Sequence, residues 1–293
     1  MICRLIEAAR RDQRIVGLAD YGSSSEGGDD QWSDIDIAVF LRDGEYDRFE
    51  QQWKSWAAQF GPLLLAYISG VGHPWTVYDA TPAPLRVDFD FHRESAIDGM
   101  LSWPNAPTSV KKMIWYDGTA GQLTSSARQL VGQSLAPADP AATYEQICGD
   151  YWYYVLRTFG KVARQKEWAA RYEFNVIITG LLHALFRFKV GALARWRASE
   201  SAPGIERVLT PHRVTQLNAC IPGSGVRSIR QALVKGVELG CEACTALHAS
   251  NGWPWPAALG ERALLMLTSA ERPDLEGRVP TAMGVPAMTL NIR

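Results

Sequence analysis

The 293-residue sequence predicts an α+β fold, in which a mixed sheet with helices is followed by an all-helical part. Strand-like alternation is clear at 34–41 and 85–91, where apolar side chains occupy every second position. From Pro140 onward, apolar residues recur at helical spacing and strand signals disappear. With 47% hydrophobic and 21% charged residues, the chain has a globular composition and can bury a core without disulfides.

The first 120 residues predict four or five strands and two or three helices. A short helix is expected over 1–11 and a longer one over 45–60, because in each the apolar residues share one face. In the longer helix the inward residues are Phe49, Trp53, Trp56, Ala57 and Phe60. Strands are expected at 14–21, 34–41, 63–69, 75–78 and 85–91.

The rest of the chain predicts a connector, a helical domain and a tail. Residues 104–140 are rich in Pro, Gly, Ser and Thr and read as a connector with one possible strand at 113–117. Helical spacing follows at 142–168, 170–197, 225–249 and 256–270. We therefore expect domains at 1–125 and 140–272, and an extended arm at 273–293.

Charge and targeting signals narrow the class of protein. The net charge is -1, whereas duplex nucleic acid binding favours a basic excess. Residues 1–100 carry a balance of -8 and the remainder +7, which would suit metal ions on one side and phosphates on the other. The N-terminus lacks a signal peptide, and the longest apolar stretch, 174–188, is too polar to span a bilayer. We expect a cytoplasmic protein without a membrane partner, and the five cysteines do not suggest a disulfide framework.

One set of residues indicates a chemical function: Gly22-Ser23 is followed, after ten residues, by Asp34-Ile35-Asp36. Side chains at i and i+2 of a strand share a face, so the two carboxylates project together, about 7 Å apart along the strand. Such a pair repels unless a cation lies between them, and hard oxygen ligands suit Mg²⁺. Gly22 allows close approach of a phosphate, to which a backbone N–H and the Ser23 hydroxyl can donate. A third carboxylate would come from Asp88 or Asp90 on the strand at 85–91.

This spacing, followed about fifty residues later by an acid on a strand, resembles the DNA polymerase β-like nucleotidyltransferase superfamily. The stretch YGSSSEGGDDQWSDIDIAVFL looks most like the antibiotic nucleotidyltransferases, in particular the larger lincosamide adenylyltransferases. A more distant likeness is to the streptomycin or aminoglycoside 6-adenylyltransferases. The stretch TVYDATPAPLRVDFDFHRES resembles the family's next strand pair, in which the third acid precedes Phe; this match selects Asp88 rather than Asp90.

The resemblance covers about 1–125 and 145–175. MIWYDGTAGQL resembles the strand that closes the N-terminal nucleotidyltransferase domain. YWYYVLRTFGKVARQKEWAAR resembles the aromatic helix that opens the C-terminal domain, whose basic residues face the triphosphate. On this helix Lys161 is the expected phosphate contact, with Arg164 one turn further.

The resemblance implies a Mg²⁺-dependent transfer of AMP from ATP, or of another nucleotide, to a hydroxyl of a small molecule, with release of pyrophosphate. The acceptor would be an antibiotic, either a lincosamide or an aminoglycoside. Asp34, Asp36 and Asp88 would be the catalytic and metal-binding residues, with Asp88 also the general base. Gly22, Ser23 and Lys161 would bind the triphosphate.

Several alternatives stay open at this stage. The acceptor could be a protein or RNA, the fold could be a nucleotide-binding scaffold without turnover, and the chain could be a monomer or a homodimer. Cys241, Cys244 and His248 could hold a metal, but their spacing on an apolar helix face favours packing. Tyr151 to Tyr154 favour a core helix, one face of which could line a substrate cleft.

Overall fold

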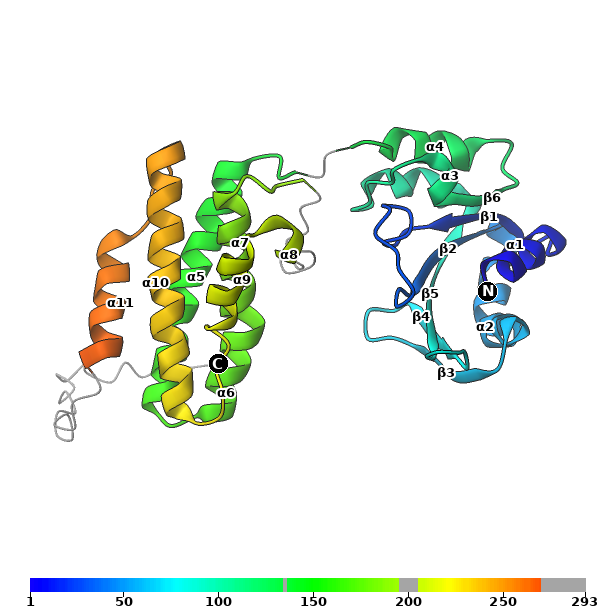
Figure 1. Cartoon of the computed structure of the whole chain (residues 1–293). Helices are drawn as coiled ribbons and strands as arrows, with labels where there is room; N and C mark the ends of the chain where they lie inside the picture. Colours follow the sequence, from blue (N-terminus) through cyan, green and yellow to red (C-terminus); the bar gives the residue numbers. More distant parts are fainter. Residues whose placement is uncertain (134–135, 195–204, 270–293) are drawn as a thin grey trace, which may run out of the picture. The chain divides into compact units, whose positions relative to one another are not determined.

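The computed structural model describes residues 1–133, 136–194 and 205–269 (Figure 1). The chain forms two compact units, one made by Met1–Ala136 and the other beginning at Pro137. The assignment of 1–125 and 140–272 to catalytic and binding domains stays a prediction. The arm predicted for 273–293 lies outside the described residues.

The first unit is built on a six-stranded mixed sheet with the order β3-β4-β5-β2-β1-β6. The central pair, β2 and β5, is parallel, and the other four strand pairs are antiparallel. The strands are β1 Ile15–Asp20, β2 Ile35–Leu41, β3 Leu63–Ile68, β4 Pro74–Tyr78, β5 Leu85–Arg93 and β6 Ile114–Asp117. These strands lie at the predicted positions, and the predicted α+β fold class is confirmed.

Helices cover both faces of this sheet. On one face, α1 (Ile2–Arg11) and α2 (Tyr46–Ala57) pack on the apolar side of β2 and β5. Every residue predicted to face inward from 45–60 is buried. On the other face, a 3-10 helix (Glu94–Ser102), α3 (Val110–Met113) and α4 (Gln122–Leu130) form a second apolar core.

The interpretation of 104–140 as a connector is wrong for most of its length. It contains α3, β6 and α4, and Leu123, Ala127 and Leu130 of α4 are completely buried. These three residues are spaced by four and three, so they form one apolar helix face. The surrounding Gly, Ser and Thr residues obscured this short amphipathic pattern.

The second unit is helical throughout its described residues. Its helices are α5 Pro140–Ala163, α6 Glu167–Glu173, α7 Thr179–Lys189, α8 Ile205–Val208, α9 Pro211–Asn218, α10 Val226–Asn251 and α11 Ala257–Ser269. The helical segment predicted over 170–197 is confirmed as far as Lys189, where α7 ends, and residues 195–197 lie outside the described residues. Within it, α6 continues through a π-helical segment at Phe174–Ile178 into α7. The short helices α8 and α9 were not predicted.

Close contact between α5 and α10 centres on Tyr151. Its hydroxyl donates to the carbonyl oxygen of Gly236 at 2.6 Å. A Cβ on Gly240 would lie 2.4 Å from the Tyr151 ring, so only glycine allows this approach. Tyr151 and Trp152 are buried, whereas Tyr153 is exposed. The predicted aromatic helix therefore contributes both to the core and to the surface.

The cysteines and histidine of α10 serve packing in this structure. The Sγ of Cys244 lies 3.8 Å from that of Cys148, both thiols being buried and free. His248 Nδ1 lies 3.0 Å from the carbonyl oxygen of Trp253, and the Trp253 ring stacks on Tyr144. In the described parts of the chain, no helix combines the length and apolar character needed to cross a membrane.

Candidate active site

A cluster of three acids lies at the centre of the sheet. The parallel pairing of β2 with β5 sets Asp36 directly beside Asp88, and Asp34 stands just before β2. One carboxylate oxygen from each of the three residues lies within 4.8 Å of the others. We call Asp34, Asp36 and Asp88 the carboxylate cluster. Among the described residues, this is where at least three metal-ligating side chains gather.

The cluster lies on the face of β5 opposite its apolar core. Val87, Phe89 and Phe91 are buried under α2, while Asp88 and Asp90 alternate with them toward the other side, as predicted. A one-residue slip of either strand would bury the acids in the core, so the apolar packing also fixes the acid positions.

Without a bound cation, burial and mutual repulsion raise the free energy of the ionised cluster. Burial, with the neighbouring charges of Asp34 and Asp88, raises the pKa of Asp36 to about 7. Burial and the Asp34 charge also raise the pKa of Asp88. Arg86 Nη2 lies 2.8 Å from Asp34 Oδ2 and partly balances the charge. Mg²⁺ prefers hard oxygen ligands and usually takes one or two protein carboxylates together with phosphate oxygens and water, so these residues fit that ion.

The Gly-Ser turn (residues 22–25) lies against this cluster. The N–H of Tyr21 donates to the carbonyl oxygen of Asp36 at 3.1 Å. A Cβ on Gly22 would lie 2.0 Å from Asp36 Oδ2. Gly22 is therefore required for the turn to approach the carboxylate. Its own N–H donates to Asp20 Oδ1 at 2.9 Å, and the exposed Ser23 stands beside it.

Replacing Gly22 by alanine is therefore expected to lower kcat/KM by about a hundredfold, because displacement of a reacting group by about 1 Å has this scale of effect. Gly28→Ala in the same loop is the matched control. Its Cβ would stand 3.6 Å from the Ser23 carbonyl oxygen, an ordinary contact. Steady-state kinetics of both variants check this, and equal activities would mean that the turn can move away from Asp36 without loss.

A hollow of about 360 Å³ opens beside the cluster, with three aromatic side chains in its wall. We call it the aromatic hollow; it is lined by Tyr21, Asp36, Val71, His73, Trp75, Asp88, Asp90, Trp103, Pro104 and Asn105. Tyr21 and Trp103 meet edge to face with ring centroids 6.1 Å apart. His73, Trp103 and Asn105 were not predicted, because they come from segments without a strand or helix period.

Asp90 belongs to the aromatic hollow and not to the carboxylate cluster. Its two oxygens lie 3.1 Å from His73 Nδ1 and 2.9 Å from His92 Nε2. The His92 ring in turn stacks on Phe40. The structure thus brings Asp88 and not Asp90 to Asp34 and Asp36. This arrangement agrees with the register that the family resemblance selected.

A smaller hollow, of about 190 Å³, adjoins the cluster at Asp34. Arg86 lines it together with the exposed Trp32 and the segment at 80–85. We call it the Asp34 hollow. Asp36 and Asp88 line the aromatic hollow and Asp34 lines this one, so the cluster borders two separate spaces.

The remaining predicted residue, Lys161, lies in the second unit on α5. It forms an ion pair with Glu173, whose carboxylate is buried and also accepts from Thr158 Oγ1 at 2.8 Å. Arg157 Nε lies 3.1 Å from the same carboxylate. Lys161 is thus held by an internal acid, and its part in nucleotide binding stays a prediction.

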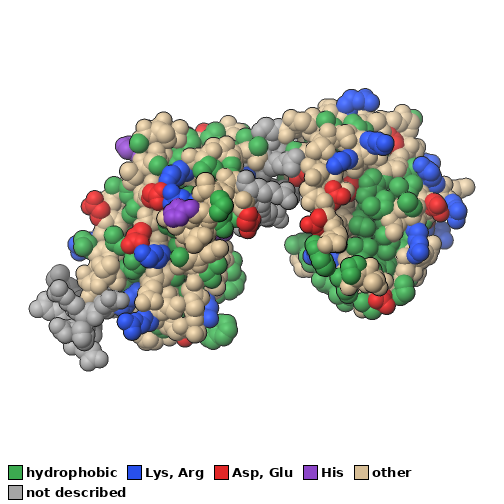
Figure 2. Space-filling view, viewed as in Figure 1, with side chains coloured by type: hydrophobic (Ala, Val, Ile, Leu, Met, Phe, Trp, Pro, Cys, Tyr) green, Lys and Arg blue, Asp and Glu red, His purple; other side chains and the backbone are tan. Residues whose placement is uncertain are grey.

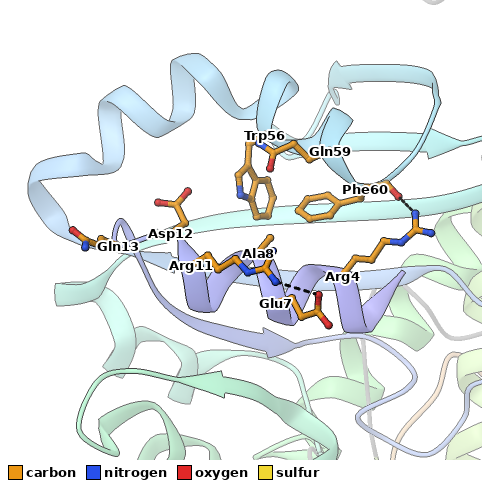
Figure 3. Close-up of a pocket in the computed structure, with 9 residues that line it drawn as sticks. All are labelled: Arg4, Glu7, Ala8, Arg11, Asp12, Gln13, Trp56, Gln59 and Phe60. Atoms are coloured by element: carbon orange, nitrogen blue, oxygen red, sulfur yellow. Dashed lines mark hydrogen bonds and ion pairs between the residues drawn. The ribbon is translucent and has the colours of Figure 1, made fainter.

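A further hollow, of about 490 Å³, lies on the face of the sheet that α1 and α2 cover (Figure 3). In it Arg4 donates to the Phe60 carbonyl oxygen at 3.1 Å, and Arg11 lies 3.9 Å from Glu7. Figure 2 shows basic side chains on the surface of the first unit where α1 lies. Because its cations are paired with neighbouring groups, this hollow is not part of the candidate site.

The mixed sheet, the turn and the acid cluster are the features expected of a nucleotidyltransferase. The family model described as streptomycin adenylyltransferase matches residues 1–264. The chain therefore belongs to the streptomycin adenylyltransferase family, and the protein is an adenylyltransferase. This confirms the predicted relationship to antibiotic nucleotidyltransferases at the level of the family.

Two solved structures resemble the fold. One is an aminoglycoside 6-adenyltransferase from Bacillus subtilis, with 12% identity, TM-score 0.43, and coverage of 92% of this chain and 97% of that chain. The other is a nucleotidyltransferase-like protein from Exiguobacterium sibiricum, with 14% identity, TM-score 0.31, and coverage of 92% and 81%. No curated protein matched the sequence.

Proposed function

We propose that the protein transfers AMP from ATP to a hydroxyl group of an aminoglycoside antibiotic, with Mg²⁺ and with release of pyrophosphate. The observation that carries this proposal is the carboxylate cluster beside the Gly-Ser turn. The family match supports an adenylyl donor and an antibiotic acceptor. The protein would act in the cytoplasm, as a monomer or homodimer.

The positions of the three acids of the carboxylate cluster suggest their roles. Asp34, Asp36 and Asp88 would hold Mg²⁺, which when bound stabilises charge on the attacking and leaving oxygens of an in-line displacement. The Ser23 side of the turn would bind the triphosphate. Asp88 lines the aromatic hollow, so it would be the cluster member next to an acceptor placed there.

The reaction balances as a single displacement. The acceptor hydroxyl oxygen forms a bond to the α-phosphorus, and the bond between that phosphorus and the α,β-bridging oxygen breaks. The hydroxyl proton passes to Asp88 as general base, and pyrophosphate leaves.

The aromatic hollow favours a cationic sugar over a neutral or anionic acceptor. Its wall combines the acids Asp88 and Asp90 with the rings of Trp75 and Trp103. Carboxylates and aromatic faces both attract ammonium and guanidinium groups. Lincosamides, toward which the sequence first pointed, are the second antibiotic class to test.

The test is mass spectrometry of streptomycin, other aminoglycosides and lincosamides after incubation with the protein, Mg²⁺ and each nucleoside triphosphate. A mass gain of one AMP on an aminoglycoside is the expected result. Gain on a lincosamide alone would replace the acceptor class. The proposal would be overturned if no compound gave a product and the label from α-labelled ATP were found on protein or RNA.

If the Lys161 cation contacts the departing pyrophosphate, Lys161→Met should lower kcat/KM by a factor that corresponds to about 3 kcal/mol of transition-state stabilisation. Arg157→Met is the matched control, because it removes the other cation on Glu173. Steady-state kinetics and thermal midpoints of both variants decide the question. A kinetic change below about threefold, under 1 kcal/mol, would leave Lys161 as a structural partner of Glu173.

A further inference from the structure

Asp20 is a buried acid that no role in the proposed reaction explains. It is the last residue of β1 and is 1% exposed. Its Oδ1 accepts from the backbone N–H of Gly22 at 2.9 Å and from that of Ser25 at 3.3 Å. Burial raises the pKa of Asp20 to about 6, although these two bonds act in the opposite direction. Burial of a carboxyl group costs free energy unless the group is hydrogen-bonded. The bonds of Asp20 to the turn therefore indicate its role.

These two hydrogen bonds hold the Gly-Ser turn from its buried side. The Ser25 hydroxyl donates to the Gly22 carbonyl oxygen at 2.8 Å, so the two residues are joined directly as well as through Asp20. From the other side, the N–H of Thr108 donates to the Ser25 carbonyl oxygen at 2.9 Å. The turn is therefore held at both ends, and Asp20 is the side chain that fixes its N–H groups.

The same bonds leave the donor groups of Ser23 available to a ligand. Ser23 is exposed, and its carbonyl oxygen accepts from the N–H of Gly28 at 2.9 Å. Within the described residues, neither its N–H nor its hydroxyl has a hydrogen-bond partner. Its neighbour Gly22 contacts Asp36 of the carboxylate cluster. Two donors thus stand next to the expected metal ligands, in a turn whose shape depends on one carboxylate.

We propose that Asp20 is a positioning residue for nucleotide binding: it fixes the Gly-Ser turn so that the N–H and hydroxyl of Ser23 meet the triphosphate beside Asp36. This inference rests on the proposed function, since it names the group that prepares the same site. An apolar side chain at this position could fill the space but could not accept from the two N–H groups.

The test compares Asp20→Leu with Asp20→Asn in the full chain. Asparagine keeps a carbonyl oxygen for the two N–H groups, whereas leucine of similar size leaves them without an acceptor. We expect Asp20→Leu to raise the KM and Kd for ATP at least tenfold with little change in the acceptor KM. Asp20→Asn should stay within about threefold of the unchanged protein.

Stability and coupling controls separate positioning from folding. Tyr78→Phe removes a buried hydrogen bond to the Ala57 carbonyl oxygen, on the face of the sheet that α1 and α2 cover. It should therefore lower the thermal midpoint without changing the Kd for ATP. Ser23→Ala should weaken ATP binding by itself. Because Asp20 acts through Ser23, the double variant should bind ATP no more weakly than Asp20→Leu alone.

Two results would overturn the inference. One is an Asp20→Leu protein that binds ATP within threefold of normal while its thermal midpoint falls; the other is an effect additive with Ser23→Ala. If the leucine variant does not fold, Asp20→Ser is measured in its place, because its short side chain cannot reach both N–H groups. Failure of the unchanged protein to bind ATP would instead overturn the proposed function.

Discussion

Replacing Asp36 by asparagine is expected to lower turnover by about a thousandfold or more. Bound metal supplies several kcal/mol of charge stabilisation, and each 1.36 kcal/mol is a factor of ten in rate. Asp36 is paired with Asp88 across the two strands and its carboxylate lies within 4.8 Å of both other acids, so its loss removes a ligand from the cluster. Single-turnover rates at saturating ATP and Mg²⁺ are the measurement.

The same substitution should stabilise the metal-free protein. The pKa of Asp36 is raised from 3.8 to about 7 in the folded protein, so its ionisation opposes folding. This penalty is absent below pH 3.8, grows as pH rises, and is complete above about pH 7. The thermal midpoint of Asp36→Asn should therefore exceed that of the unchanged protein at pH 8 and approach it near pH 4.

The control for Asp36 is Glu50→Gln, which removes one acid from the exposed side of α2 across the sheet. It should change neither turnover nor the pH dependence of the thermal midpoint. A fall of many degrees in Asp36→Asn at pH 8 would show that Asp36 supports the fold and not the metal. Full activity of that variant would exclude it as a ligand.

Replacing Asp88 by asparagine should remove catalysis while ATP still binds. General base catalysis contributes about 10²- to 10⁴-fold, and Asp34 and Asp36 remain to hold the nucleotide's metal. We therefore expect kcat to fall on this scale with the Kd for ATP within a few-fold of normal. Equilibrium binding and product formation are measured on the same preparation.

Asp90→Asn is the matched comparison for Asp88, two residues along the same face of β5. Asp90 contacts His73 and His92, so its loss should alter the acceptor KM more than kcat. If Asp90→Asn abolishes turnover and Asp88→Asn does not, the third acid has been assigned to the wrong position.

The parts of this site that could be predicted lie on strands. Alternation at 85–91 places Asp88 opposite Val87 and Phe89, and the Asp-x-Asp spacing places Asp34 and Asp36 together. Such periods follow from backbone geometry and are visible in one sequence. Their juxtaposition across the sheet depends on which strands pair, which the family resemblance indicated and periodicity alone did not.

The parts that were missed depend on tertiary contacts. Asp20 looks like the polar end of a strand, and only its burial shows that it supports the Gly-Ser turn. His73 and Trp103 come from irregular segments that meet only after folding. The π-helical segment at Phe174–Ile178 is a local change to i→i+5 hydrogen bonding inside a continuous helical run, which apolar spacing in one sequence did not reveal.

The pairing of β2 with β5 has a consequence for altering this enzyme in the laboratory. The strands that carry the acids are separated in the chain by α2, β3 and β4, yet they lie in register through buried side chains. Variation confined to Val71, His73, Trp75 and Trp103 would change the wall of the aromatic hollow without touching that register. Libraries that seek a new acceptor can therefore leave both strands constant and select only among these four positions.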